Sequence, residues 1–171
     1  PSIRFQNSCV GEATQFQLGN STTTSAVWNF GDGNTSNSLS PTHTYTAPGT
    51  YTVSVTATSS SGTGVTTRDI IISAVPTATQ PNNISICDDN NDGFYNFDLT
   101  SRKLAILNGQ SESQFNVRYF ANAVNYSNNV VISNPASFQN TTVYQSHTII
   151  AEVYNIAHPN CKTPTTFDIQ V

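Results

Sequence analysis

Charged side chains are scarce in this sequence. Only 9% of the 171 residues are charged, whereas about 25% is usual for a soluble protein. The chain has six Lys and Arg residues, which are scattered, and a formal net charge of −4. No basic stripe is therefore present that could neutralise the phosphates of a nucleic acid, and we expect no nucleic-acid partner.

Long apolar runs and helix-forming stretches are lacking as well. No apolar run approaches the roughly 18–20 residues that a membrane-spanning helix needs, so we expect no membrane insertion. One short helix is predicted at residues 101–108, where Thr100 or Ser101 would cap it and Gly109 would end it. A helical enzyme is thus disfavoured.

Strand-forming residues dominate what is present. Thr, Val, Ile, Tyr and Phe recur in short alternating runs that are separated by Gly, Pro, Asn, Asp and Ser. In a first block, residues 1–73, the alternation and the turn signals predict a small β-sandwich. Its expected strands lie at residues 14–18, 26–30, 50–57 and 64–72.

A second block follows a connector that contains two prolines. The connector, residues 74–81, carries Pro76 and Pro81, which favour an extended and semi-stiff linker. Residues 82–171 again alternate apolar and polar side chains. The sequence thus predicts an all-β chain of two tandem β-sandwiches, and the strands expected in the second lie at residues 84–87, 95–99, 115–122, 130–132, 142–156 and 165–171.

Motifs in the first block resemble those of the polycystic kidney disease (PKD) domain, an immunoglobulin-like extracellular module. The sequence WNFGDG at residues 28–33 is followed by PTHTY at 41–45 and PGTYTVSV at 48–55. The resemblance implies a sandwich with Trp28 and Tyr51 in the core, and a spacer or adhesive role rather than catalysis. The residues that carry it are Trp28, Phe30, Gly31, Asp32, Gly33, Tyr45, Gly49 and Tyr51.

The second block resembles a repeat of secreted and cell-surface proteins of Bacteroidota. The motifs are CDDNNDGF at residues 87–94, FDLT at 97–100, the strand at 115–120, IAEV at 150–153 and the late NC at 160–161. Such repeats often follow a PKD module and precede a C-terminal sorting domain of the type IX secretion system. The resemblance therefore implies an extracellular location, neighbouring modules in the same chain, and a secretion translocon as a partner.

Acidic and amide residues at alternate positions predict a structural calcium site in the second block. Asp88, Asn90 and Asp92 precede a glycine, as in loops that wrap oxygen ligands around a hard cation. The carbonyl of Phe94 and the carboxylate of Asp98 would complete the site. Crowded carboxylates repel one another unless a cation or protons neutralise them. The alternative is a turn whose Asp and Asn side chains bond to their own backbone.

The chain has three cysteines. Cys87 and Cys161 lie near the first and last strands of the second block, so we predict a disulfide that would clamp its ends and indicate an oxidising, extracellular setting. Cys9 would then be a small buried apolar residue, a free thiol or a partner of a neighbouring module. Reduced, buried thiols are the alternative to the bond.

Several aromatic and acidic residues invite a functional interpretation. Trp28, Tyr45 and Tyr51 could stack on a sugar, although core packing fits their motif positions better. Asp32 lies in a turn with no second carboxylate nearby in sequence, so we expect no catalytic role and no enzyme. Any exposed aromatic residues of the second block would mark a partner surface. The candidates are Tyr119, Phe120, Tyr126 and Phe138.

Two functions fit these observations. The first is a non-catalytic module pair of an exported bacterial surface protein, which would space other modules and adhere to a surface glycan or protein. The second is an accessory module pair that guides a secreted hydrolase to its polysaccharide or protein substrate. An exposed row of aromatic rings on one sheet would favour the second function.

Overall fold

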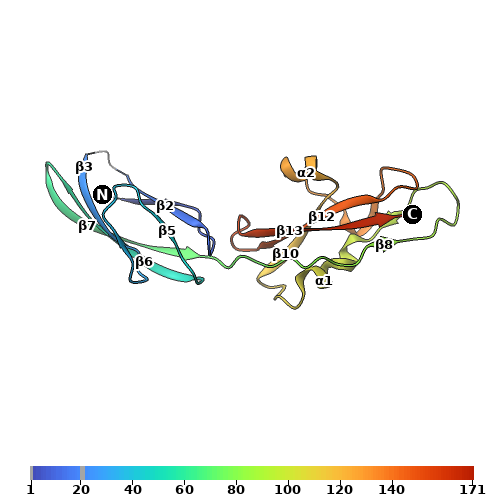
Figure 1. Ribbon diagram of the computed structural model, residues 1–171, viewed down its shortest axis with the longest axis horizontal. Helices are drawn as coiled ribbons and strands as arrows, with labels where there is room; N and C mark the ends of the chain where they lie inside the picture. Colours follow the sequence, from blue (N-terminus) through green and yellow to red (C-terminus); the bar gives the residue numbers. More distant parts are fainter. Residues whose placement is uncertain (1, 20–21) are drawn as a thin grey trace. The chain divides into compact units, whose positions relative to one another are not determined.

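The computed structural model describes residues 2–19 and 22–171. The chain divides into two compact units, Pro1–Ala74 and Val75–Val171. Each unit is a β-sandwich with its own buried interior (Figure 1). Among the helices in this part of the chain, none is long and apolar enough to cross a membrane.

The first unit consists of two layers of antiparallel strands. One layer has the order β4-β3-β6-β7 and the other β1-β2-β5 (Figure 1). The predicted strands are present with shifted ends, and the structure adds short strands that alternation alone does not reveal. The bounds are β1 (Ile3–Gln6), β2 (Ala13–Leu18), β3 (Thr23–Asn29), β4 (Thr35–Ser36), β5 (Thr42–Thr44), β6 (Gly49–Ser59) and β7 (Gly62–Ile72).

Alternate residues of these strands build the first core. On β6, Val53 and Val55 are fully buried, while their threonine and serine neighbours point to the other side of the sheet. Trp28, on the paired strand β3, is also fully buried. Phe5, Val10, Leu18 and Tyr51 pack against this core and are partly buried. The buried core cluster comprises Ile3, Phe16, Ala26, Trp28, Phe30, Tyr45, Val53, Val55, Ile70 and Ile72.

The second unit is built on a four-stranded sheet of order β10-β12-β13-β8, in which β8 runs parallel to β13. A short ladder of β9 and β11 and small helices complete it, and α1 and α2 lie on opposite sides of the sheet (Figure 1). The bounds are β8 (Ile84–Ser85), β9 (Asn96–Phe97), η1 (Leu99–Arg102), α1 (Lys103–Leu107), β10 (Phe115–Phe120), α2 (Ala123–Ser127), η2 (Pro135–Ser137), β11 (Phe138–Gln139), β12 (His147–Asn155) and β13 (Lys162–Gln170).

The second unit differs locally from the sequence prediction. Residues 130–132 form no strand, and residues 142–146 form a loop before β12. The predicted helix at residues 101–108 is replaced by η1 followed by α1, because Asp98 accepts a hydrogen bond from the Thr100 amide and starts the turn earlier. Helix α2 was not predicted; Asn122 caps it by accepting a hydrogen bond from the Asn125 amide.

Most of the predicted linker, residues 74–81, belongs to the second unit, which begins at Val75. The side chain of Gln110 bonds to both the amide and the carbonyl of Thr77. The Thr79 amide donates to the Ile106 carbonyl, and the Thr163 hydroxyl donates to the Pro76 carbonyl. This extended segment therefore owes its order to hydrogen bonds as well as to its prolines.

A buried carboxylate lies on the α2 side of the second sheet. Glu152 on β12 is fully buried, and its Oε1 accepts from Nε and Nη2 of Arg118, both at 2.6 Å. Its Oε2 lies 2.9 Å from Lys162 Nζ. Lys162 also lies over the ring of Tyr126 from α2. The carboxylate thus links three strands of the sheet, and Lys162 links it to the helix.

We expect Glu152→Gln to lower the free energy of unfolding by about 3 kcal/mol, because the change leaves two cations without their buried partner. Chemical denaturation followed by fluorescence measures this. The matched control is Glu112→Gln, whose carboxylate pairs with Lys103 at 2.8 Å but is 52% exposed; it should cost less than about 1 kcal/mol. Equal losses in the two variants would contradict the structural role of Glu152.

Candidate functional site

The Gly31-Asp32-Gly33 loop follows β3 and requires both glycines. Gly31 has φ +84° and Gly33 has φ +93°, which side chains with a Cβ rarely adopt. A Cβ atom at position 31 would also lie 2.7 Å from the carbonyl oxygen of Thr52. The loop therefore passes close to the backbone of β6, and this approach explains the motif in physical terms.

Asp32 is held by its neighbours in this loop. Its Oδ2 lies 2.7 Å from His43 Nε2 and accepts a hydrogen bond from the side chain of Asn34. Its Oδ1 accepts a hydrogen bond from the Asn34 amide. The His43 ring stacks on Phe30 with centroids 4.3 Å apart. Burial opposes the charged form, but the hydrogen bonds from His43 and Asn34 outweigh it and lower the pKa of Asp32. These bonds explain the residue fully as a structural one.

The aromatic motif residues lie in or against the first core. Trp28 is fully buried and donates from Nε1 to the Ser38 carbonyl at 2.9 Å. Tyr45 is buried too, and its hydroxyl donates to the Phe30 carbonyl at 3.0 Å. Tyr51 is partly buried, donates to the Ala47 carbonyl and packs on Tyr45, while Gly49 begins β6. Trp28 and Tyr45 therefore offer no surface for a sugar.

The lowered pKa of Asp32 predicts a pH-dependent contribution to stability. A carboxyl whose pKa falls on folding stabilises the folded state above its ordinary value of 3.8, and that stabilisation is lost as the pH falls through the lowered value. We expect Asp32→Asn to cost about 1 kcal/mol at pH 6, and the difference from wild type to shrink below about pH 4. Urea denaturation across pH measures this. Glu12→Gln is the control; a similar pH profile for both variants would contradict the prediction.

The loop of residues 88–93 is closed by the carboxylate of Asp88. Its Oδ1 accepts from the amides of Asn90 and Asn91, and its Oδ2 accepts from the amide of Gly93 at 2.7 Å. The hydrogen bond from Gly93 is the main reason that the pKa of Asp88 lies below its usual value. Asp92 accepts from the side chain of Asn90 and from the Phe94 amide. Backbone amides thus stabilise much of the negative charge.

A second loop, residues 141–146, lies against this one. Asn140 joins the two by donating to the carbonyls of Gly93 and Thr142 and by accepting from the Tyr95 amide. Tyr144 donates to Asp88 at 3.3 Å, and a Cβ at Gly93 would collide with Val143. The absence of a side chain at Gly93 therefore lets the loops meet.

Exposed aromatic residues gather at these paired loops. Phe94, Tyr95 and Tyr144 are 42%, 43% and 55% exposed. They are the exposed large aromatic side chains within residues 2–19 and 22–171. The candidates chosen from the sequence are different: Tyr119 and Phe120 are buried, and Tyr126 and Phe138 are partly buried. The sequence did contain a signal for Phe94 and Tyr95, because the Asp and Asn residues just before them predict a surface loop, in which aromatic side chains are exposed.

The predicted calcium ligands are not all brought together. Asp98 is engaged at the start of η1, where it accepts from the amide and the hydroxyl of Thr100. No group of three or more His, Cys, Asp or Glu side chains is placed to hold a metal within the described part of the chain. Asp88, Asn90 and Asp92 do share one loop with the carbonyl of Phe94 nearby. Calcium at this loop stays a prediction.

The predicted Cys87–Cys161 disulfide is wrong. Cys9 and Cys161 are the disulfide-bonded cysteines, and Cys87 is free and exposed. The bond therefore joins a residue of the first unit to one of the second. Cys9 lies beside the end of β7, since it forms an isolated bridge with Ser73, and Cys161 lies just before β13. The positions of Cys87 and Cys161 near the ends of the second block therefore did not identify Cys9 as the partner of Cys161.

Family comparisons account for both units. The family described as the Flavobacterium inter-domain disulphide bond domain matches residues 83–171, more than half of the chain. The chain belongs to this family. The PKD domain family matches residues 2–73. Both kinds of module are typical of extracellular proteins and are typically non-catalytic, and the first family is consistent with the resemblance to Bacteroidota repeats.

Solved structures with similarity to the chain include two bacterial PKD domains. The PKD1 domain of Vibrio anguillarum Epp is 27% identical, covering 43% of this chain and 90% of that one (TM-score 0.36). The PKD1 domain of the Vibrio cholerae metalloprotease PrtV is 29% identical, covering 41% and 93% (TM-score 0.33). Fibronectin(III)-like modules of Clostridium thermocellum CbhA are 14% identical, covering 99% and 94% (TM-score 0.45). No curated protein matches the chain.

Proposed function

We propose that the chain is a non-catalytic extracellular module pair that spaces neighbouring modules and adheres to a surface glycan or protein through the paired loops of the second unit. The gathering of Phe94, Tyr95 and Tyr144 on these loops carries the adhesive part of the proposal. Exposed aromatic rings beside carboxylates and amides offer both stacking and hydrogen bonds to a partner.

The engagement of the acidic residues supports a role without catalysis. Asp32 is bonded to His43 and Asn34, and Glu152 is paired with Arg118 and Lys162. A catalytic pair of carboxylates needs two groups that face a common substrate. Each of these acids is instead occupied by its own structural partners.

Export by type IX secretion, with the translocon as a partner, belongs to the same proposal. The resemblance of residues 82–171 to repeats of Bacteroidota surface proteins supports it, and the match to a Flavobacterium family is consistent with it. The second candidate, an accessory module pair of a secreted hydrolase, would use the same loops to reach an insoluble substrate. The modules that share the full-length chain distinguish the two.

We expect the intact chain to bind at least one polymer in a panel of surface polysaccharides and matrix proteins. The double variant Phe94→Ala, Tyr144→Ala should bind that polymer at least about fivefold more weakly, because each lost stacking contact costs about 1 kcal/mol. Surface plasmon resonance measures this. Val65→Ala is the control, because Val65 is an apolar residue that is 67% exposed in the first unit. Absence of binding to the whole panel would refute adhesion, and undiminished binding by the double variant would exclude these loops.

A structural calcium ion at residues 88–94 is a further part of the proposal. Asp88, Asn90 and Asp92 bring three oxygen-bearing side chains into one loop, and Asp88 already closes it through the Gly93 amide. A hard cation favours carboxylate, amide and carbonyl oxygens. Its charge would offset the repulsion between Asp88 and Asp92 and would hold Phe94 in its place on the adhesive surface.

We expect calcium to raise the unfolding temperature of the intact chain by several degrees over that in chelator, because an ion that binds only the folded state stabilises it. Scanning calorimetry with calcium or with chelator measures this. Asp92→Asn should abolish the difference, whereas Asp69→Asn in the first unit should retain it. Identical unfolding temperatures with calcium and chelator would remove the ion from the proposal.

A further inference from the structure

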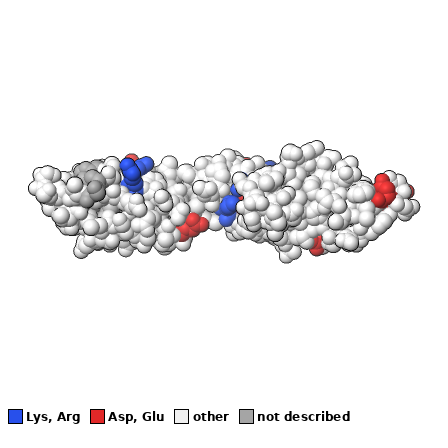
Figure 2. Space-filling view, turned by 90° about the horizontal axis from the view of Figure 1, so that it is seen from above, with Lys and Arg blue, Asp and Glu red and all other residues white. Residues whose placement is uncertain are grey.

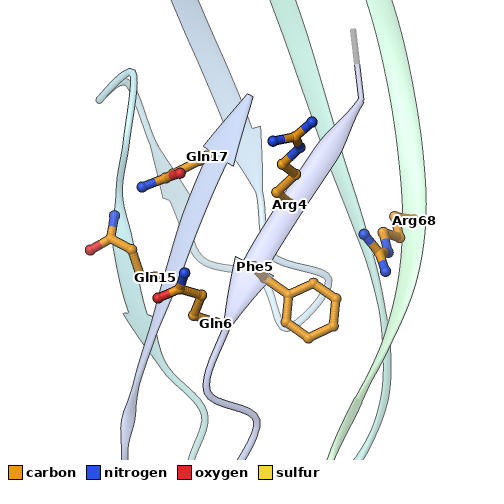
Figure 3. Close-up of a pocket in the computed structure, with 6 residues that line it drawn as sticks. All are labelled: Arg4, Phe5, Gln6, Gln15, Gln17 and Arg68. Carbon is orange, nitrogen blue, oxygen red and sulfur yellow. The ribbon is translucent and has the colours of Figure 1, made fainter. Parts of the chain in front are cut away.

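An open groove lies on the first unit, away from the motifs already described. Its volume is about 360 Å³, and it is lined by Arg4, Phe5, Gln6, Gln15, Gln17 and Arg68 (Figure 3). Strands β1 and β2 supply five of these residues and β7 supplies Arg68. Arg4 pairs with Gln17 and Gln6 with Gln15 across the β1–β2 ladder, so these four side chains share the outer face of the sheet.

The two arginines of the groove carry positive charge that no acidic side chain balances. No acidic residue lines the groove, and neither Arg4 nor Arg68 forms an ion pair in the described part of the chain. Of the other four Lys and Arg residues, Lys103, Arg118 and Lys162 are paired with glutamates, and Arg102 donates to the carbonyls of Asn82 and Asn83. Charged residues are sparse on the face drawn in Figure 2. Two unpaired guanidinium groups together are therefore a distinct feature of this surface.

Arg68 is fixed in place before any ligand arrives. Its Nη1 donates to the carbonyl of Ile3 at 2.7 Å, and its guanidinium carbon lies 4.8 Å from the centre of the Phe5 ring. Figure 3 shows Phe5 and Arg68 side by side, with Arg4 on the neighbouring part of β1. Both arginines are exposed, and the contacts with Ile3 and Phe5 restrain the Arg68 side chain, so less side-chain entropy remains to be lost there on binding.

The glutamines supply a second kind of recognition. Gln15 Nε2 donates to the carbonyls of Ser40 and Pro41, which fixes the plane of its amide. Gln6 and Gln17 are exposed. Gln6 and Gln17 each offer both a donor and an acceptor, whereas Gln15, whose Nε2 is taken up by backbone carbonyls, offers its oxygen as an acceptor. This combination suits hydroxyl groups, whereas a simple anion needs only donors. Guanidinium groups in turn suit carboxylates.

We propose that this groove binds an acidic saccharide, in which a uronate carboxylate contacts Arg4 and Arg68 and ring hydroxyls contact the glutamine amides. The groove is open, so it fits a stretch of polysaccharide lying across the strands. Two cations on a protein of net charge −4 are too few for a nucleic acid. The inference rests on the proposed function only in taking a glycan as partner, since the loops of the second unit are not involved.

The test uses the intact chain with polygalacturonate, with its methyl ester, and with polyphosphate. We expect binding to polygalacturonate that weakens as salt is raised, and at least fivefold weaker binding to the ester, which keeps the hydroxyls but lacks the charge. Arg4→Gln should weaken polygalacturonate binding at least fivefold, and Gln17→Ala about twofold to threefold. The control Lys103→Gln removes the same charge from the other unit and should have no effect.

Each contrary outcome overturns a definite part of the inference. Binding that is unchanged in Arg4→Gln, or equal for the acid and its ester, would exclude this groove or the carboxylate. Equal binding to polyphosphate would show a simple anion site without saccharide recognition. The test does not use a substitution of Arg68, because Arg68 also bonds to the Ile3 carbonyl and its loss would affect the fold as well as binding. Absence of binding to polygalacturonate would overturn the inference. If binding to other polymers were retained and depended on Phe94 and Tyr144, the proposed function would still hold.

Discussion

The disulfide between Cys9 and Cys161 is the covalent constraint that encloses most of the chain. It closes a loop of roughly 150 residues, which in the chain-entropy model stabilises the folded chain by about 5 kcal/mol. Both cysteines are buried, 3% and 0% exposed, and such a bond persists in an oxidising environment. The extracellular character of both families fits this chemistry.

Hydrogen bonds between short polar side chains and the backbone replace much of the charge that this protein lacks. Asp32 and Asp88 each accept from amides two or more residues ahead, so local bonds order both loops, and His43 and Tyr144 add one distant partner each. Three of the few charged groups are instead gathered in one cluster, in which the buried Glu152 pairs with Arg118 and Lys162. On such a surface few neighbouring charges are available to balance an unpaired one.

Sequence patterns predicted what depends on local repetition and failed where tertiary pairing decided. Alternation predicted β6, β7 and β13, and the glycines around Asp32 predicted a turn. Strands of two residues, such as β4 and β11, carry too few side chains to show a period. The disulfide could not be derived from loop entropy, since doubling a loop changes the closure cost by only about 0.6 kcal/mol. The groove was also missed, because Arg68 is distant in sequence from β1.

In the proposed spacer role the chain would carry load between neighbouring modules, and the position of the disulfide decides which residues would experience that load. Force applied at the ends of the chain reaches Cys9 and Cys161 and then crosses the covalent bond, so the backbone between them is bypassed. Among the strands of residues 2–19 and 22–171, β1 and β13 are the two that lie outside this closed loop. β13 is an inner strand, paired with β12 on one side and β8 on the other, so its removal requires the rupture of two ladders. β1 pairs with β2 alone and is therefore the weaker end, and Arg68, which donates from β7 to the Ile3 carbonyl, fastens that strand across the edge of the sandwich.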